Sequence, residues 1–275
     1  MSRLDASPLL RRVLLPAFER LNPGDVTIRN HHTGDPMTIH SYRHKGYWFH
    51  GAKREAATLA MLRRLIGAGD QVLEAGGHIG YVTLFLADLV GPGGGVVVFE
   101  PGPGNLAYLR PNVASRPNVR VVAAAVSDHN GIADFYVENL SGQNNSLVED
   151  FAVFEEVKRS AHSVERYEKI QVPVVTLSDW CQNEQFVPDW LKIDIEGAEY
   201  EALEGAAELL DLHTPGMMIE VTLNQQAVQD RLQARGYAFF SPTGQHLPRL
   251  DDFRGNLFAL HNDKHHKQIS GISVR

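Results

Sequence analysis

Residues 71–105 constrain the fold of this chain more than any other stretch. A short apolar run is followed by a cluster of glycines, and apolar residues then recur at helical spacing over 79–90. A second apolar run over 96–99 ends at Glu100. Strand, glycine turn, helix and strand, in that order, are typical of a nucleotide-binding βαβ unit. The chain is therefore expected to form an open α/β sheet around this unit.

The glycine turn, E-A-G-G-H-I-G over 74–80, has no glycine at 78 and so departs from the dinucleotide fingerprint G-x-G-x-x-G. An acid two residues before the first glycine is also foreign to that fingerprint. A nicotinamide-dependent oxidoreductase is the alternative, and these two departures count against it. Both features suit the adenosylmethionine form of the doubly wound fold, whose ligand carries an amino acid and a sulfonium instead of a pyrophosphate. The missing Cβ atoms of Gly76, Gly77 and Gly80 would let backbone N–H groups approach that ligand.

Two strand ends carry further candidates for ligand contact. Glu100 comes 24 residues after Gly76, where a nucleoside-binding fold places a carboxylate for both ribose hydroxyls. A third strand is expected over 119–126, and Ser127 and Asp128 follow at its carboxyl end. Open α/β sheets bind ligands outside the carboxyl ends of their strands, so this pair is a candidate for an adenine contact. An Asp here also suits a turn.

Length and composition favour one large domain with additions. Of 275 residues, 43% are hydrophobic, which is enough for a single core. We expect an N-terminal extension or cap over 1–50, a ligand-binding domain over 51–262 and a polar tail over 263–275. The net charge of −7 argues against a nucleic-acid surface, which needs clustered Lys and Arg.

The cysteine count and the length of the apolar runs bear on the compartment, and the spacing of the histidines bears on metal binding. The single Cys181 excludes an internal disulfide, and a cytoplasmic address is the default expectation. No apolar run approaches 18 residues and the N-terminus is too charged for a signal peptide, so we expect no membrane partner. The histidines within 31–50 and 261–266 lack the spacing or the nearby carboxylates of a metal site and are interpreted as surface residues.

The second half of the chain completes the sheet after an interruption. A strand-like stretch over 131–138 precedes a candidate lid insertion over about 139–169, whose residues 147–169 carry aromatic side chains at helical spacing. Further strands are expected at 190–194, 217–222, 237–240 and 256–260, the last two forming an antiparallel hairpin. With the three earlier strands, the sheet has seven.

Five stretches together resemble the FkbM family of S-adenosylmethionine-dependent O-methyltransferases, from about Tyr47 to Leu260. They are E-A-G-G-H-I-G-Y (74–81), F-E-P-G-P-G-N (99–105), A-V-S-D (125–128), L-K-I-D-I-E-G-A-E (191–199) and I-E-V (219–221). Glu55 and N-S-L (145–147) match the family as well. The resemblance implies the class I methyltransferase fold, a Rossmann-like, doubly wound α/β sheet of seven strands with a C-terminal antiparallel hairpin. It also implies methylation of a hydroxyl on a small molecule, such as a sugar or a secondary metabolite.

The same resemblance assigns the cofactor site residue by residue. The cofactor-binding positions are Glu74, Gly76, Gly77, His78, Gly80, Glu100, Asn105, Ser127, Asp128 and Asp194. Glu74 with the glycines would line the methionine end, Glu100 would hold the ribose, and Asn105 would order the turn after Glu100. His78 departs from the family, which usually has Asn there, and an imidazole donor could take over that contact with the cofactor carboxylate.

The methyl-transfer chemistry independently points to the strand at 190–194. An alcohol needs a base as its new C–O bond forms, and strand alternation puts Lys192, Asp194 and Glu196 on one face. Charged groups in a buried strand are costly without a partner or a ligand, so these three are the candidate catalytic residues. Glu220 is a further candidate.

Several alternatives stay open at this level. Lys192 could form a purely structural pair with a carboxylate while Glu196 caps the next helix. Asp194 and Glu196 could hold Mg²⁺ with substrate oxygens, although no metal is predicted. A catalytically silent protein that keeps a methyltransferase-like fold for binding is also compatible with the sequence, as is a homodimer.

Overall fold

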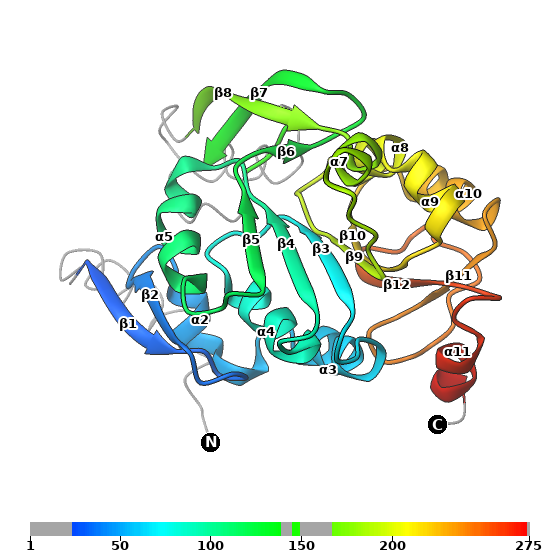
Figure 1. Ribbon diagram of the computed structural model, residues 1–275, viewed down its shortest axis with the longest axis horizontal. Helices are drawn as coiled ribbons and strands as arrows, with labels where there is room; N and C mark the ends of the chain where they lie inside the picture. The colour runs from blue at the N-terminus through cyan, green and yellow to red at the C-terminus, as the bar shows by residue number, and fades with distance from the viewer. Residues whose placement is uncertain (1–23, 139–144, 149–166, 274–275) are drawn as a thin grey trace.

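The computed structural model describes residues 24–138, 145–148 and 167–273, and a sheet of seven strands forms its centre (Figure 1). In spatial order the strands are β11 (Tyr237–Phe240), β12 (Gly255–His261), β10 (Gly216–Val221), β9 (Trp190–Ile193), β3 (Gln71–Ala75), β4 (Gly95–Phe99) and β5 (Val119–Val122). The last five run parallel, whereas β12 is antiparallel to β10 and to β11. This order, with its antiparallel hairpin, confirms the predicted sheet.

Helices cover both faces of the sheet, because its parallel strands are apolar on both sides. One face packs against α3 (Ala56–Leu65), α4 (Tyr81–Val90) and α5 (Pro103–Val113). The other packs against α7 (Leu177–Glu184), α8 (Glu199–Gly205), α9 (Ala207–His213) and α10 (Gln225–Gln233). Successive strand residues point to opposite cores, since Val72 belongs to the first and Leu73 to the second. The fold is doubly wound, as predicted.

The strand expected over 119–126 is in fact two strands in two sheets. β5 stops at Val122 because β4, its partner, stops at Phe99 and offers nothing further to pair with. The chain then bends, and β6 (Ala125–Val126) joins a three-stranded sheet with β8 (Tyr167–Val175) and β7 (Gly131–Glu138). This small sheet lies at the carboxyl end of β5 (Figure 1). The apolar run 121–126 continues through the break and concealed it.

The described part of the N-terminal extension belongs to the same core as the sheet. A hairpin of β1 (Asp25–Arg29) and β2 (Pro36–His40) packs on α5, where the Asn112 side chain bonds both the N–H and the C=O of Thr38. Met37 and Ile39 of β2 are fully buried. A helix, α2 (Lys45–His50), and a short 3₁₀ turn, η2 (Gly51–Lys53), then lead to α3. The domain boundary at residue 50 stays a prediction.

The C-terminal residues correct the expectation of a polar tail. Residues 266–273 form a helix, α11 (His266–Ser273), which accepts a hydrogen bond from Arg64 of α3 and whose Ile272 is buried in the same core as α3. Two histidines interpreted as surface residues, His44 and His265, are also buried. Their Nδ1 atoms accept hydrogen bonds from the N–H groups of His40 and His261. Burial lowers the pKa of each to about 4.

Two other expectations concern the lid insertion and the membrane. Most of the candidate lid over 139–169 lies outside the described residues, which here include only 145–148 and the start of β8. Within the described ranges, every helix is too short or too polar to cross a membrane.

Candidate active site

A cavity of about 320 Å³ opens at the carboxyl ends of β3, β4, β9 and β10. This volume lies at the lower end of the range for small-molecule sites. The lining combines the glycine turn after β3, the acid after β4, residues 124–126, the charged stretch 192–196 and residues 47, 54 and 55 from the N-terminal region. The cavity therefore forms where open α/β sheets bind ligands.

The glycine turn serves the packing of the protein more than the approach of a ligand. A Cβ atom on Gly76, whose φ is +89°, would lie 1.9 Å from the backbone oxygen of Asp194. A Cβ on Gly77 would meet Val98 at 2.3 Å, and one on Gly80 would meet Leu109 at 3.0 Å. The glycines are thus required because β9 and α5 pass close to the turn.

The backbone N–H groups of the turn are used inside the fold. Those of Gly76 and Gly77 both donate to the carbonyl of Phe99, at 3.0 and 3.1 Å, and that of Gly80 donates to Gly77 at 2.9 Å. His78, a non-glycine residue with positive φ, donates its N–H to Glu100 Oε2 at 2.8 Å. The amides of Gly76, Gly77 and Gly80, which the sequence offered for contact with a ligand, thus already have acceptors within the protein.

Glu100 is held as an acceptor at the cavity wall. Its Oε1 atom accepts from the N–H of Gly102 at 2.9 Å and from Asn105 Nδ2 at 3.2 Å, so Asn105 orders the turn as predicted. Its Oε2 atom accepts from His78 and has capacity for another donor. Burial raises the pKa of Glu100 to about 7, although these three hydrogen bonds favour the charged form.

Lys192 lies beneath the cavity and binds three acceptors at once. Its Nζ atom donates to the carbonyl of Gly76 at 2.8 Å and lies 3.3 Å from both Glu74 Oε1 and Asp194 Oδ2. Glu74, fully buried, also accepts from Thr83 at 2.6 Å. Burial alone would lower the pKa of Lys192, but the charges of Asp194 and Glu74 raise it above its usual value. The ammonium is therefore enclosed by one hydrogen-bond acceptor and two carboxyl groups.

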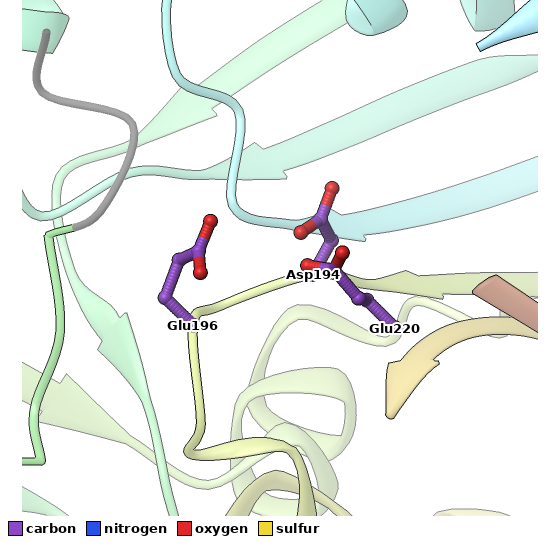
Figure 2. Close-up of side chains that lie close together, drawn as sticks. All are labelled: Asp194, Glu196 and Glu220. Carbon is purple, nitrogen blue, oxygen red and sulfur yellow. The ribbon is translucent and has the colours of Figure 1, made fainter. Parts of the chain in front are cut away.

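The predicted face of alternating charges continues past Lys192 into a group of three carboxyl residues. Asp194, Glu196 and Glu220 bring oxygen atoms within 4.8 Å of one another, a spacing at which a divalent cation can be held. Figure 2 shows the carboxyl groups of Asp194 and Glu220 side by side, with that of Glu196 on the same side of the chain. The sequence predicted Asp194 and Glu196 as catalytic residues and Glu220 as a further candidate.

These carboxyl groups have different pKa values although they are neighbours. Burial raises the pKa of Asp194, but the charge of Lys192 outweighs burial and lowers it overall. Burial and the negative charge of Asp194 raise the pKa of Glu220 to about 10 and that of Glu196 to about 8. Near neutral pH, Asp194 is thus ionised, whereas Glu220 and most of Glu196 are protonated.

The N-terminal region supplies a wall that the sequence did not reveal. Tyr47 of α2 is buried against the turn, and its hydroxyl lies 2.8 Å from His78 Nδ1. Arg54 lies over the Tyr47 ring at 4.5 Å and pairs through Nε with Glu55 Oε1 at 3.3 Å. Only Glu55 carried a signal in the sequence, through its match to the family.

Ser127 and Asp128 do not line the cavity as far as the structure describes it. Ser127 is buried, and its N–H donates to the carbonyl of Val175 in the small sheet. The Asp128 side chain is half-exposed and lies 2.7 Å from His129. The cause is the break after β5, which puts Ala124, Ala125 and Val126 at the cavity instead.

Relatives of this chain are methyltransferases. Over 119 residues it is 27% identical to the 2-O-methyltransferase NoeI of Sinorhizobium fredii, a match that covers 41% of this chain and 47% of NoeI. The chain thus spans about half the length of that relative. Among solved structures, methyltransferase FkbM from Methylobacillus flagellatus is 15% identical with a TM-score of 0.43, covering 79% of this chain and 62% of that one. Aeropyrum pernix fibrillarin, solved with S-adenosyl-L-methionine, is 13% identical with a TM-score of 0.41, covering 86% and 83%.

The family assignment rests on a longer match. Residues 74–254, more than half of the chain, match the Methyltransferase FkbM domain. This range begins at the glycine turn and includes Glu100, Lys192, Asp194 and Glu220. The chain therefore belongs to the FkbM family of methyltransferases.

Proposed function

We propose that this protein is an S-adenosylmethionine-dependent O-methyltransferase that acts on a hydroxyl of a small molecule, a sugar or a secondary metabolite. The observation that carries the proposal is a cavity, in an FkbM-family chain, with Glu100 at one wall and ionisable carboxyl groups at the end of β9. The name of its relative, a 2-O-methyltransferase, supports transfer to oxygen.

The residues of the cavity fit S-adenosylmethionine in shape and charge. Apolar side chains, among them Phe99, Val126 and Phe135, offer a surface for the adenine. Glu100 Oε2 can accept a ribose hydroxyl. The carboxylate of Asp194 suits the positive sulfonium and ammonium groups at the other end.

Glu196 is the residue best suited to take the acceptor proton. Bound S-adenosylmethionine supplies an electrophilic methyl group, and the acceptor oxygen must lose its proton as it takes that group. A general base works best when its pKa lies near the working pH, and Glu196 has a pKa of about 8. Asp194, whose pKa is lowered, is a weaker base. Turnover should therefore rise with pH through the pKa of Glu196 in the loaded site, which the positive cofactor lowers from about 8.

Lys192 and Asp194 then act by position and charge. Lys192 is buried between Gly76, Glu74 and Asp194, so it holds Asp194 ionised and fixes the end of β9 against Gly76. Asp194 contributes a permanent negative charge at the cavity floor. The predicted catalytic group is kept, with the role of base assigned to Glu196.

Calorimetric titration with S-adenosylhomocysteine tests the cofactor assignment. Glu100→Gln should lose at least about tenfold in affinity, since hydrogen bonds to charged groups contribute roughly 1.5–3 kcal/mol each. Asp128→Asn, which changes a half-exposed carboxylate outside the cavity, should bind normally. Tight binding of NADH by a wild-type protein that ignores S-adenosylhomocysteine would contradict the proposal.

Transfer itself needs labelled S-adenosylmethionine and a panel of hydroxylated sugars and metabolites. Label should appear on an acceptor oxygen with the wild type. Cofactor binding without any transfer across the panel would favour the silent binding protein. A cytoplasmic address and a homodimer stay predictions.

A further inference from the structure

The cavity has an excess of acid that creates a problem for one part of the proposed cofactor. Among its described lining residues, six carry carboxyl groups and two, Arg54 and Lys192, are permanent cations. The methionine moiety of S-adenosylmethionine has two positive groups, which such a cavity favours. It also has a carboxylate, which the cavity repels unless a positive donor lies at hand.

The backbone around the turn offers that carboxylate little. The N–H groups of Gly76, Gly77, His78 and Gly80 all donate to acceptors within the protein. Binding the carboxylate there would break these bonds, each of which holds the turn to β4 or to itself. A side-chain donor would leave these bonds intact. The His78 imidazole, which the sequence offered for this contact, has its Nδ1 atom 2.8 Å from the Tyr47 hydroxyl and is not a permanent cation, so Lys192 and Arg54 are compared here.

Lys192 is not available for this role. Its ammonium donates to the carbonyl of Gly76 and lies 3.3 Å from the carboxyl groups of Glu74 and Asp194. Its side chain is 4% exposed, so a ligand could reach it only by displacing one of these partners.

Arg54, in contrast, is a partly accessible cation with donors to spare. Its side chain is 22% exposed, and its Nε atom lies 3.3 Å from Glu55 Oε1. Neither terminal nitrogen donates a hydrogen bond to any part of the chain that the structure describes. A guanidinium presents these two nitrogens as a fork that matches a carboxylate.

The position of the guanidinium is fixed by packing. It lies over the Tyr47 ring, 4.5 Å from the centroid, and the Tyr47 hydroxyl is 2.8 Å from His78 Nδ1 in the glycine turn. Gly46 makes room for it, since a Cβ atom there would lie 2.9 Å from Arg54 Nη1. Arg54 is thus held at the end of the cavity where the turn follows β3.

We propose that Arg54 binds the carboxylate of the methionine moiety of S-adenosylmethionine, an inference that rests on the proposed function. Glu55 lies beside Nε, which leaves the two terminal nitrogens as the donors for the ligand. Arg54 lies outside residues 74–254, the part that matches the family. The N-terminal region therefore completes the cofactor site.

Two ligands separate this role from a general effect on the cavity. S-Adenosylhomocysteine carries the amino acid, whereas 5′-methylthioadenosine has the same nucleoside and thioether without it. In calorimetric titrations, Arg54→Gln should weaken S-adenosylhomocysteine at least about tenfold and leave 5′-methylthioadenosine within about twofold. Lys53→Gln, which removes the same charge from the exposed neighbouring residue, should change neither affinity.

The other outcomes are equally informative. Equal weakening of both ligands, or no weakening of either, would overturn the role of Arg54 while the proposed function stands. A wild-type protein that binds neither ligand would overturn the proposed function, and this inference with it. If Arg54→Gln does not fold, Gly46→Ala provides the test, because it displaces Nη1 and keeps the charge. It should weaken S-adenosylhomocysteine alone by a few-fold, and no selective loss would reject the proposal.

Discussion

Replacing Glu220 by glutamine should stabilise the ligand-free protein, and by more at about pH 8 than at about pH 5. Burial and the charge of Asp194 raise the pKa of Glu220 to about 10, from a usual value of 4.5. The folded protein therefore keeps this proton at a pH where the unfolded chain releases it. A glutamine is neutral in both states, and its amide can donate to Asp194 as the protonated carboxyl does.

The sign and the size follow from proton linkage. A group whose pKa is raised on folding gives its full stability below the unfolded pKa, and that stability is lost as the pH rises toward the folded pKa. The loss is at most about 1.4 kcal/mol per pH unit, or about 4 kcal/mol between pH 5 and pH 8. For a chain of this size, each kcal/mol shifts the melting temperature by roughly 2–4 °C.

Thermal melting of wild type and Glu220→Gln across this pH range measures the difference directly. Glu208→Gln, at an exposed position of α9, is the matched control and should leave the pH dependence unchanged. A Glu220→Gln protein that is less stable than wild type at pH 8, or equally stabilised at both pH values, would refute the protonated state assigned to Glu220.

Three further outcomes are expected. Gly76→Ala should destabilise by at least about 3 kcal/mol in urea unfolding, because its Cβ would meet the Asp194 backbone at 1.9 Å; Gly69→Ala, also at positive φ but with open space, should cost about 1 kcal/mol. Lys192→Met should cost about 3–5 kcal/mol in the same assay, since the fully buried Glu74 and the partly buried Asp194 lose their cation. Glu196→Gln should lower kcat by about 10²–10⁴-fold with unchanged S-adenosylhomocysteine affinity, and equal turnover would remove it as the base.

The sequence predicted the parts of the fold that depend on local periodicity. The βαβ unit was predicted because the apolar spacing changes from strand to helix to strand within 71–99. A parallel sheet follows when that order repeats along the chain. Alternation along 190–196 also predicted that Lys192 and Asp194 share a face, and the structure places them 3.3 Å apart. Glu220 joins them because β10 is the neighbour of β9 and ends at the same edge.

Features set by pairing between distant segments could not be predicted in this way. Nothing in the stretch 119–126 shows that β4 ends at Phe99, opposite Val122. The break after Val122, and with it the position of Ser127 away from the cavity, therefore could not be predicted. Arg54 and Tyr47 reach the cavity because the N-terminal hairpin packs on α5 and directs the following turn back over β3. No spacing within the sequence records such a route.

The arrangement of charges explains why proton transfer to Glu196 is suited to this cavity. On the proposed function, bound S-adenosylmethionine would supply a methyl group whose C–S bond is exchanged for a C–O bond to the acceptor, and the Glu196 carboxylate would take the acceptor proton. One positive charge, on the cofactor, and one negative charge, on Glu196, would then be lost together. The net charge of the buried site is conserved, so Lys192 and Asp194 need not adjust. A positive ligand also lowers the pKa of nearby carboxyl groups, which favours ionised Glu196 before transfer and a protonated one after it. The raised pKa of Glu196, a cost to the empty site, is in this way the property that lets it act as a base only when the cofactor is loaded.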